Sequence, residues 1–393
     1  MTTGTTAGAA AIDVTVVMPC LNEADTLAAC IRKAQAGLAA AGVRGEIVVA
    51  DNGSTDGSPD IARDLGARVV PVAQRGYGMA LMKGIESAGG RFIIMGDADD
   101  SYDFTEIPRF VEAWRAGAEL VQGCRLPAGG GRVLPGAMPW SHRWIGNPLF
   151  TRLARWWFRS PIHDVYCGLR GFTPELYRRL DLRCAGMEYA TEMIIKASLL
   201  GARVTEVPIT LHPDGRKSHK PHLRTLRDGW RTLRFLLLFS PRWLFRVPGW
   251  LLIALGAAGY AVALPGLRVR GVTFDAHTLL FASLWIICGF QSLLFGTFAR
   301  RYGRIIGLLP GEPPAAGRRS WTLERGLLLS SAAVLAGGLL LGWAMLYWWE
   351  TGLGALDYAK TMRWVIPGST LTVLGFQGIL ASFFIGVLEL KHR

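Results

Sequence analysis

Four long apolar stretches in the carboxyl-terminal part of this 393-residue chain constrain its fold more than any other feature. They run approximately over residues 247–264, 279–299, 326–348 and 365–388. Each approaches the roughly 20 apolar residues that a helix needs to cross a lipid bilayer. The sequence therefore predicts that residues 247–393 form a transmembrane domain of about four helices.

The residues before these stretches have a different character. Residues 13–220 interrupt short apolar runs with charges, as a soluble α/β domain does. The first 12 residues are small and lack a basic segment followed by an apolar one, so no secretory signal is predicted. We expect a flexible amino terminus over residues 1–12 and a cytosolic domain over residues 13–220.

The formal net charge of +13 is compatible with nucleic acid, anionic lipid or phosphorylated substrates as partners. Basic residues crowd between Arg216 and Arg246, directly before the first apolar stretch, which favours a membrane surface over nucleic acid. We expect residues 221–246 to form amphipathic juxtamembrane helices. A basic, tryptophan-rich segment over residues 138–160 also suits the headgroup layer, with an ordinary surface helix as the alternative.

Basic residues are also unevenly spread between the apolar stretches. The connection between the second and third stretches holds six arginines, whereas the other two connections hold two basic residues each. Cytoplasmic loops of membrane proteins carry the excess of Lys and Arg. The sequence therefore predicts a multi-pass membrane protein with both termini in the cytosol, and we expect it in a bacterial inner membrane.

Short β-branched runs alternate with segments of helical spacing in the first half of the chain. The predicted strands cover residues 12–18, 46–50, 68–72, 91–96 and 119–123, and the predicted helices cover residues 23–40, 56–65, 77–88 and 104–116. Such alternation predicts a mostly parallel sheet with helices on both faces. Ligands of these sheets bind beyond the carboxyl ends of the strands.

The strongest chemical signal, Gly96-Asp97-Ala98-Asp99-Asp100, follows the fourth predicted strand. Two carboxylates two residues apart at a strand end can hold a divalent cation, Mg²⁺ or Mn²⁺, which neutralises a departing diphosphate. Taken alone the pattern is weak, because acidic turns after strands are common.

Two further motifs follow the first and second predicted strands. Pro19-Cys20-Leu21-Asn22-Glu23 follows the first, and Asp51 follows the second, where its carboxylate is placed to accept hydrogen bonds from a base or ribose. Arg75-Gly76-Tyr77-Gly78 opens a helix with glycines that permit a close backbone approach to a ligand.

Together these residues resemble family 2 of the GT-A glycosyltransferases, and within it the dolichyl- or polyprenyl-phosphate mannose and glucose synthases, over about residues 14–220. The resemblance implies a Rossmann-like GT-A fold, a GDP- or UDP-hexose donor and a metal. The donor-binding residues that it implies are Pro19, Leu21, Glu23, Val49, Asp51, Asp97, Ala98, Asp99, Arg216 and Lys217, and the metal site that it implies comprises Asp97, Asp99 and Ser101. Leu21 stands where the family usually has an aromatic residue.

Three later segments are similar to the same family. They are Gly123-Cys124-Arg125, the run from Asp164 to Arg170, and Arg216-Lys217-Ser218, which resembles a basic loop that closes over the diphosphate. The resemblance implies catalytic roles for Asp97, Asp99, Arg125, Asp164 and Arg170, and Arg125 and Arg143 are candidates to hold an acceptor phosphate. The alternatives are a structural ion pair between Asp164 and Arg170, and lipid contact for Arg216 and Lys217.

The segment from Tyr189 to Met193 departs from the family pattern. Many family-2 enzymes have an aspartate at the position of Met193, where it is the general base for a sugar hydroxyl. A thioether is only a weak acceptor and cannot replace it. A phosphate monoester needs no base, because its second pKa is about 6.

The sequence therefore predicts an inverting, metal-dependent transfer of a hexose from a nucleotide-sugar to a polyprenyl phosphate at the cytosolic membrane face. One alternative is transfer to a hydroxyl of a glycan or glycolipid. Another is a non-catalytic membrane protein that binds a sugar nucleotide or a lipid carrier. The expected partners are the donor, the lipid and the membrane, with no nucleic acid and no oligomeric state assigned.

Overall fold

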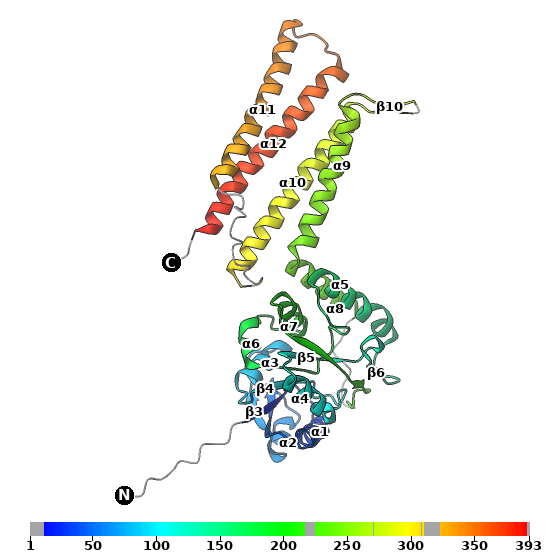
Figure 1. The fold of residues 1–393 in the computed structure, drawn as a ribbon, viewed down its shortest axis with the longest axis vertical. Helices are drawn as coiled ribbons and strands as arrows, with labels where there is room; N and C mark the ends of the chain where they lie inside the picture. The colour runs from blue at the N-terminus through cyan, green and yellow to red at the C-terminus, as the bar shows by residue number, and fades with distance from the viewer. Residues whose placement is uncertain (1–11, 217–224, 270, 308, 310–322, 391–393) are drawn as a thin grey trace, which may run out of the picture. The chain divides into compact units, whose positions relative to one another are not determined.

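The computed structural model describes residues 12–216, 225–269, 271–307, 309 and 323–390 (Figure 1). The chain divides into two compact units, Met1–Leu236 and Leu237–Arg393, and each is described by itself. The predicted domain boundary at residues 220 and 221 lies outside the described residues.

A seven-stranded sheet with the strand order β3-β2-β1-β4-β7-β5-β8 forms the centre of the first unit. β7 lies between β4 and β5 and is antiparallel to both, whereas all the other pairs of neighbours are parallel. The strands of this sheet are β1 (Val14–Cys20), β2 (Gly45–Asp51), β3 (Arg68–Pro71), β4 (Phe92–Met95), β5 (Leu120–Cys124), β7 (Arg170–Phe172) and β8 (Val204–Pro208). A separate parallel pair joins β6 (Arg132–Val133) to β9 (Thr210–Leu211).

Helices cover both faces of the sheet. The helices in this part of the chain are α1 (Leu27–Ala40), α2 (Ser58–Asp64), α3 (Tyr77–Glu86), η1 (Phe104–Glu106), α4 (Ile107–Arg115), η2 (Pro127–Gly129), η3 (His142–Gly146), α5 (Asn147–Phe158), α6 (Pro174–Leu180), α7 (Glu188–Leu199) and α8 (Thr225–Phe239), the last of which crosses into the second unit. Successive side chains of a strand point to opposite faces. Val16 and Met18 of β1 accordingly pack in one core with α1 and α4, and Val17 packs in another with α3, α6 and α7.

The predicted alternation of strands and helices is confirmed, with ends that differ by a few residues. α1 begins at Leu27 instead of residue 23, because the amides of Thr26 and Leu27 turn back to the Glu23 carbonyl. The antiparallel strand β7 was not predicted. The mostly parallel sheet with helices on both faces confirms the GT-A class of fold for this unit.

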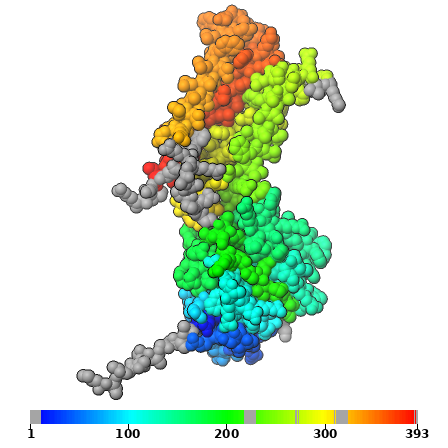
Figure 2. All heavy atoms as spheres, viewed as in Figure 1, coloured from blue at the N-terminus to red at the C-terminus, as the bar shows by residue number. Residues whose placement is uncertain are grey.

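The second unit is built from long apolar helices. The described elements are η4 (Arg242–Arg246), α9 (Val247–Ala263), the hairpin of β10 (Arg268–Val269) and β11 (Val272–Thr273), α10 (Ala276–Ile305), α11 (Leu323–Glu350) and α12 (Tyr358–Glu389). Within the described part of the chain, four helical segments are long and apolar enough to cross a membrane, and they are Arg242–Ala263, Ala276–Ile305, Leu323–Glu350 and Tyr358–Leu388. Each predicted stretch lies within one of these segments, apart from residue 264. α9 packs on α10, and α11 packs along α12 (Figures 1 and 2).

Glycine permits the close contact between α11 and α12. A Cβ atom on Gly337 would lie 2.6 Å from the carbonyl oxygen of Gly368 and would touch the hydroxyl of Thr372. Gly338, the next residue of α11, is exposed, and a Cβ there would meet nothing within 4 Å. Small residues at such interfaces let transmembrane helices approach closely, because these helices associate largely by packing.

We expect Gly337→Val to destabilise the second unit by about 1–3 kcal/mol, because the added side chain overpacks the interface between the two helices. Gly338→Val is the matched control, since it makes the same chemical change one residue away on the exposed side. Thermal unfolding of the purified chain in detergent measures both. Equal unfolding temperatures for the two variants would contradict this packing.

Candidate active site

Loops from several strands meet at one edge of the main sheet. β1, β2, β4 and β5 end at this edge, and β7 begins there because it runs in the opposite direction. Ligands of open α/β sheets bind at such an edge. The topology thus gathers the predicted site segments, which are residues 19–23, 51–54, 97–101 and 164–170 together with Arg125.

Asp97 follows β4 and is partly accessible to solvent. Its Oδ1 atom accepts a hydrogen bond of 2.8 Å from the phenol of Tyr77, at the start of α3. Burial, and after it the nearby carboxylate of Asp99, raises the pKa of Asp97 to about 6. A carboxylate in this situation gains more from a positive neighbour than an exposed carboxylate does.

The loop over residues 164–170 packs directly on Asp97. A Cβ atom on Gly168 would lie 2.9 Å from Oδ2 of Asp97 and 3.1 Å from the Tyr102 hydroxyl, so a side chain does not fit here. The Gly168 amide donates a hydrogen bond of 2.7 Å to that hydroxyl. This glycine therefore lets the loop cover the Asp97 side chain.

Asp99 has partners on both carboxylate oxygens. Oδ1 accepts hydrogen bonds from the hydroxyl and the amide of Ser101 at 2.6 and 3.1 Å, and Oδ2 lies 3.2 Å from Nη1 of Arg216. Ser101, predicted as a third metal ligand, therefore lies beside Asp99 and keeps lone pairs on its oxygen. Asp100 instead pairs with Lys33 of α1 at 2.7 Å.

Arg216 connects the basic loop to these carboxylates. Its guanidinium binds Glu23 through two nitrogens, with Nε 2.9 Å from Oε2, and also reaches Asp99. The Gly215 amide donates to the Asp99 carbonyl at 2.9 Å and holds the backbone in this place. Burial disfavours the charged guanidinium, but its carboxylate partners raise the pKa of Arg216 overall. Lys217, the other predicted basic ligand, lies outside the described residues.

The residues present fit a hard divalent cation. The Arg216 guanidinium already lies against Asp99, and the raised pKa of Asp97 marks a second carboxylate that favours a positive neighbour. Among the described residues, no group of three or more His, Cys, Asp or Glu side chains is arranged to hold a metal. Mg²⁺ commonly uses one or two carboxylates together with substrate phosphates and water. Two aspartates therefore suit a cation that arrives with a diphosphate.

The predicted nucleoside-binding residues lie on the loops after β1 and β2. The carboxylate of Asp51 accepts hydrogen bonds of 3.2–3.3 Å from the amides of Gly53 and Ser54, so it shapes its own turn. Pro19 is partly exposed and Leu21 is 40% exposed. Both side chains are therefore accessible to a ligand.

The side chains of Val49 and Ala98 do not face the edge of the sheet. Val49 is fully buried in the core, and β2 pairs with a strand on either side of it, so its predicted contact with the donor stays a prediction that its side chain does not support. Alternation along β2 turns its side chain into the protein. Ala98 is also buried, and its carbonyl accepts a hydrogen bond of 2.7 Å from the Thr26 hydroxyl, which holds the two aspartates in place.

Asp164 pairs with Arg125 and not with Arg170. Nε and Nη2 of Arg125 lie 2.7 and 2.9 Å from the two carboxylate oxygens of Asp164, and the Arg125 amide donates to the same group. Both side chains are buried. Burial disfavours the charged form of Arg125, but Asp164 outweighs this and raises its pKa. The pair fixes the guanidinium at the carboxyl end of β5.

Arg170 and Arg143 have other surroundings. Arg170 is fully buried and donates to the carbonyls of Cys167 and Ala190, so it braces the 164–170 loop against α7. Burial lowers the pKa of Arg170. These contacts do not support a catalytic role and favour a structural one. The Arg143 guanidinium lies over the Trp144 ring, 5.2 Å from its centroid.

Glu192 directly precedes Met193, the residue that stands where the family has its general base, and its carboxylate is held in the interior of the protein. Glu192 is fully buried, forms an ion pair of 2.9 Å with Lys196 and accepts hydrogen bonds from the amides of Arg183 and Cys184. Met193 is fully buried in the core that covers the other face of the sheet. Neither side chain is placed to take a proton from a substrate.

Sequence reasoning did not assign roles to two features that shape the site. The Asn52 side chain donates to the carbonyls of Val72 and Gln74 and accepts from the Gly76 amide, so it positions the loop that leads to Tyr77. The signal in the sequence that could have identified Asn52 was its position as a polar residue directly after a strand. The second feature is His163, whose Nδ1 lies 2.6 Å from Oε2 of Glu206 on β8, and no spacing in the sequence links these two residues.

Two regions of the chain match known protein families. Residues 15–180 match the family described as Glycosyl transferase family 2. Residues 297–389 match the family described as Glycosyltransferase family 2 C-terminal transmembrane region.

Individual relatives extend this similarity to nearly the whole chain. The chain is 36% identical to the low-salt glycan biosynthesis hexosyltransferase Agl6 of Haloferax volcanii, over 95% of this chain and 88% of that protein. It is 31% identical to the dolichyl-phosphate hexose transferase of the same organism, over 42% of this chain and 69% of that protein. It is 29% identical to the undecaprenyl-phosphate 4-deoxy-4-formamido-L-arabinose transferase of Edwardsiella ictaluri, over 76% of this chain and 91% of that protein.

We expect Asp164→Asn to lower the free energy of unfolding of the first unit by about 3–5 kcal/mol, because it leaves the Arg125 charge buried without a counter-charge. Lys33→Gln is the control. It removes a partly exposed ion pair with Asp100 and should cost no more than about 1 kcal/mol. Denaturant unfolding of the full chain, followed by tryptophan fluorescence, compares them. A loss for Asp164→Asn as small as that for Lys33→Gln would contradict the buried pair.

Proposed function

Because this chain belongs to glycosyltransferase family 2, we propose that it transfers a hexose from a nucleotide-sugar to the phosphate of a polyprenyl lipid, with inversion at the anomeric carbon. Its chemistry is therefore that of a hexosyltransferase, and its long apolar helices make it a membrane protein. The names of two relatives, which contain dolichyl phosphate and undecaprenyl phosphate, support the choice of acceptor.

One observation carries the choice of a phosphate acceptor over a hydroxyl. Where the family has its general base, Met193 lies in the core, and the neighbouring carboxylate of Glu192 is held by Lys196 and two backbone amides. A hydroxyl acceptor has to lose a proton during the reaction, whereas a phosphate monoester is already a dianion at neutral pH.

Donor binding is assigned to the edge of the sheet around Asp97 and Asp99. A bound Mg²⁺ or Mn²⁺, held by these two aspartates with Ser101 beside them, supplies charge neutralisation for the diphosphate. Arg216 has a second role there, because its guanidinium can exchange its contacts with Glu23 and Asp99 for phosphate oxygens. The loops with Pro19, Leu21 and Asp51 then receive the nucleoside.

The acceptor phosphate is assigned to Arg125. Asp164 binds two of its guanidinium nitrogens, Nε and Nη2, and so fixes its orientation, while Nη1 takes no part in that pair. Arg143 is a weaker candidate for the same phosphate, since its guanidinium stacks on Trp144. The exposed Trp140, Trp144 and Trp156 on the same part of the chain suit the headgroup layer.

The reaction then needs no proton transfer. A phosphate oxygen of the lipid forms a bond to the anomeric carbon, while the bond from that carbon to the diphosphate breaks on the opposite face. The leaving nucleoside diphosphate takes the bonding electron pair. The residues of the chain position the two substrates and balance their charges, and such positioning is a sufficient source of rate enhancement.

A hydroxyl acceptor is the second candidate, and His163 is the observation that favours it. Its imidazole is partly exposed, adjoins Asp164 in the chain and is oriented by Glu206 at 2.6 Å. An imidazole held by a carboxylate is a common general base. If the acceptor is a hydroxyl, we expect His163→Gln to abolish transfer. If the acceptor is a phosphate, we expect this variant to be nearly as active as the unchanged enzyme.

The proposed orientation places the sugar chemistry in the cytosol. Arg300, Arg301 and Arg304 lie at the end of α10, and the hairpin at its other end carries Arg268. The excess of positive charge at the first end supports a cytosolic location for it and for both termini.

We expect Asp99→Asn to reduce transfer at least about a hundredfold while the protein stays folded and membrane-inserted, because it removes negative charge from the proposed metal site. Asp100→Asn is the matched control, since Asp100 is the adjacent residue and pairs with Lys33 outside the site. Labelled hexose moved into the lipid fraction, with Mg²⁺ present, measures both. Full turnover by Asp99→Asn would show that Asp99 is not part of the metal site.

We also expect the purified enzyme to glycosylate a polyprenyl phosphate and to leave the corresponding polyprenol, which lacks the phosphate, unmodified. The physical reason is that a phosphate oxygen needs no base, whereas the alcohol needs one, and neither Met193 nor Glu192 is placed to act as that base. Screening GDP- and UDP-hexoses against both lipids and against free sugar acceptors measures this preference. Transfer to the polyprenol or to a sugar at a comparable rate favours the hydroxyl acceptor instead.

A further inference from the structure

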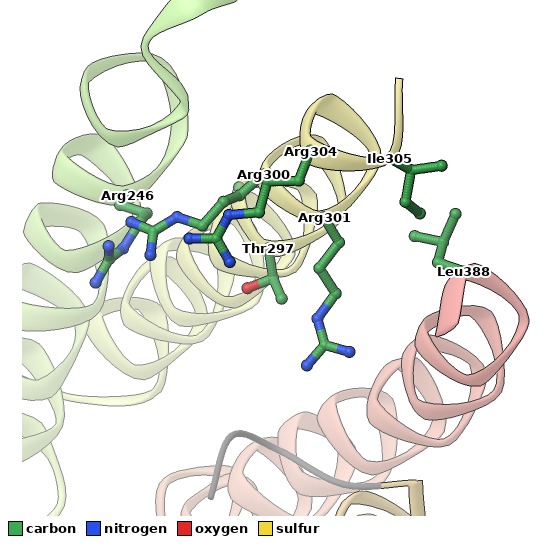
Figure 3. Close-up of a pocket in the computed structure, with 8 residues that line it drawn as sticks. Arg246, Thr297, Arg300, Arg301, Arg304, Ile305 and Leu388 are labelled. Atoms are coloured by element: carbon green, nitrogen blue, oxygen red, sulfur yellow. The ribbon is translucent and has the colours of Figure 1, made fainter. Parts of the chain in front are cut away.

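The second unit contains a basic pocket of its own, separate from the residues assigned to sugar transfer. Its volume is about 450 Å³. The residues that line it come from η4, α10 and α12, and they are Arg246, Gly296, Thr297, Arg300, Arg301, Arg304, Ile305 and Leu388 (Figure 3). Half of these are arginines, and none of the described lining residues is acidic.

The arginines converge from two helical elements. In Figure 3 the side chains of Arg300 and Arg304 extend towards Arg246, and Arg301 extends in the direction of α12. All four are half-buried. A guanidinium remains charged at every physiological pH. Guanidinium groups bind phosphate oxygens through paired N–H donors, so four of them around one cavity suit an anionic ligand.

Neighbouring contacts hold the pocket in shape. The Ser292 hydroxyl donates a hydrogen bond of 2.8 Å to the Phe245 carbonyl and so fixes η4 on α10. Phe298 of α10 contacts Phe384 of α12 edge-to-face, with ring centroids 4.8 Å apart. A Cβ atom on Gly296 would lie 3.2 Å from the Arg246 side chain, so this glycine gives that arginine its room. These contacts fix η4 and α12 on α10 beside the pocket.

The position and lining of the pocket favour a lipid. Arg300 and Arg304 lie in the last two turns of α10, where a transmembrane helix leaves the hydrocarbon for the headgroups. Ile305 and Leu388 add an apolar wall beside the charges. Basic pockets between transmembrane helices at this depth bind phosphorylated lipid headgroups.

We propose that this pocket, built around Arg246, Arg300, Arg301 and Arg304, binds the phosphate headgroup of a membrane lipid. The shared chemistry is a phosphate group on an apolar chain, with polyprenyl phosphate and anionic phospholipid as its two sources. A dianionic phosphate monoester matches four guanidinium groups better than a phosphodiester with one charge does. The site is additional to the acceptor site assigned to Arg125 and does not require the proposed sugar transfer.

The test compares two double variants with equal loss of charge. Arg246→Gln with Arg300→Gln removes two arginines of the pocket. Arg242→Gln with Arg325→Gln removes two exposed arginines outside it, of which Arg242 lies on the same short helix as Arg246. The full chain is placed in phosphatidylcholine nanodiscs doped with either polyprenyl phosphate or phosphatidylglycerol, and native mass spectrometry counts the retained lipids.

We expect the unchanged protein and the Arg242/Arg325 variant to retain one more phosphate lipid than the Arg246/Arg300 variant does. A titration should show binding that is weaker by roughly fivefold for each pocket arginine removed. If the Arg246/Arg300 variant unfolds, the test is repeated with Arg300→Gln and Arg304→Gln, which both lie on α10. Sugar transfer is assayed on the same samples, so inactivity of the unchanged protein towards any donor counts against the proposed function and not against the pocket.

Three outcomes would overturn the pocket as a lipid site. One is equal lipid retention in the pocket variant and the unchanged protein. Another is an equal loss in both double variants, which would mean a general attraction to surface charge. The third is competition by millimolar inorganic phosphate that fully displaces the lipid, which would assign the pocket to a free anion.

Discussion

The negative charges of Asp97 and Asp99 have to be balanced, and much of the first unit is arranged around that requirement. Tyr77 donates to one carboxylate, and Arg216 approaches the other while it also binds Glu23. These contacts join α3, the loop after β1 and the segment after β9 to the end of β4. The same atoms that balance the aspartates therefore bring distant parts of the chain together. A diphosphate with its cation can replace the guanidinium at this place, because it offers the same balance of charge.

Local patterns in the sequence were sufficient for the elements and for the centre of the site. The strands and the transmembrane segments were predictable, because hydrophobic period and length are properties of short windows. Asp97, Asp99, Glu23 and Arg216 were predicted as parts of one site, and the structure joins Asp99 and Glu23 through Arg216, with Asp97 two residues before Asp99. Family resemblance contributed here, because no spacing rule relates Glu23 to Arg216. The topology did the rest, since it places the carboxyl ends of the parallel strands at one edge.

The remaining differences arise from tertiary contacts that short windows do not contain. The partner of Asp164 depends on how β5 and the loop before β7 meet, and the sequence left Arg170 open as a partner where the structure has Arg125. The burial of the Val49 side chain was not predictable, because a motif match does not state which face of a strand a side chain occupies. Strand β7 has only three residues, which is too short for a period to be visible. The ion pair that holds Glu192 in the interior could not be predicted without the fold around its partner Lys196.

The reversed direction of β7 has a consequence for how such an enzyme diversifies. A strand that runs against its neighbours starts where they stop, so the segment between β5 and β7 leaves and re-enters the sheet at the same edge. That segment, with η3 and α5, is an excursion whose two ends are pinned by Arg125 and Asp164. Apart from β6, which pairs with β9, this segment adds no described strand to a sheet, so its other parts can change in length without shifting the main sheet. The proposed acceptor residues Arg125 and Arg143 lie at its start and within it, whereas the proposed donor residues lie on other loops, so the two groups of residues can vary separately.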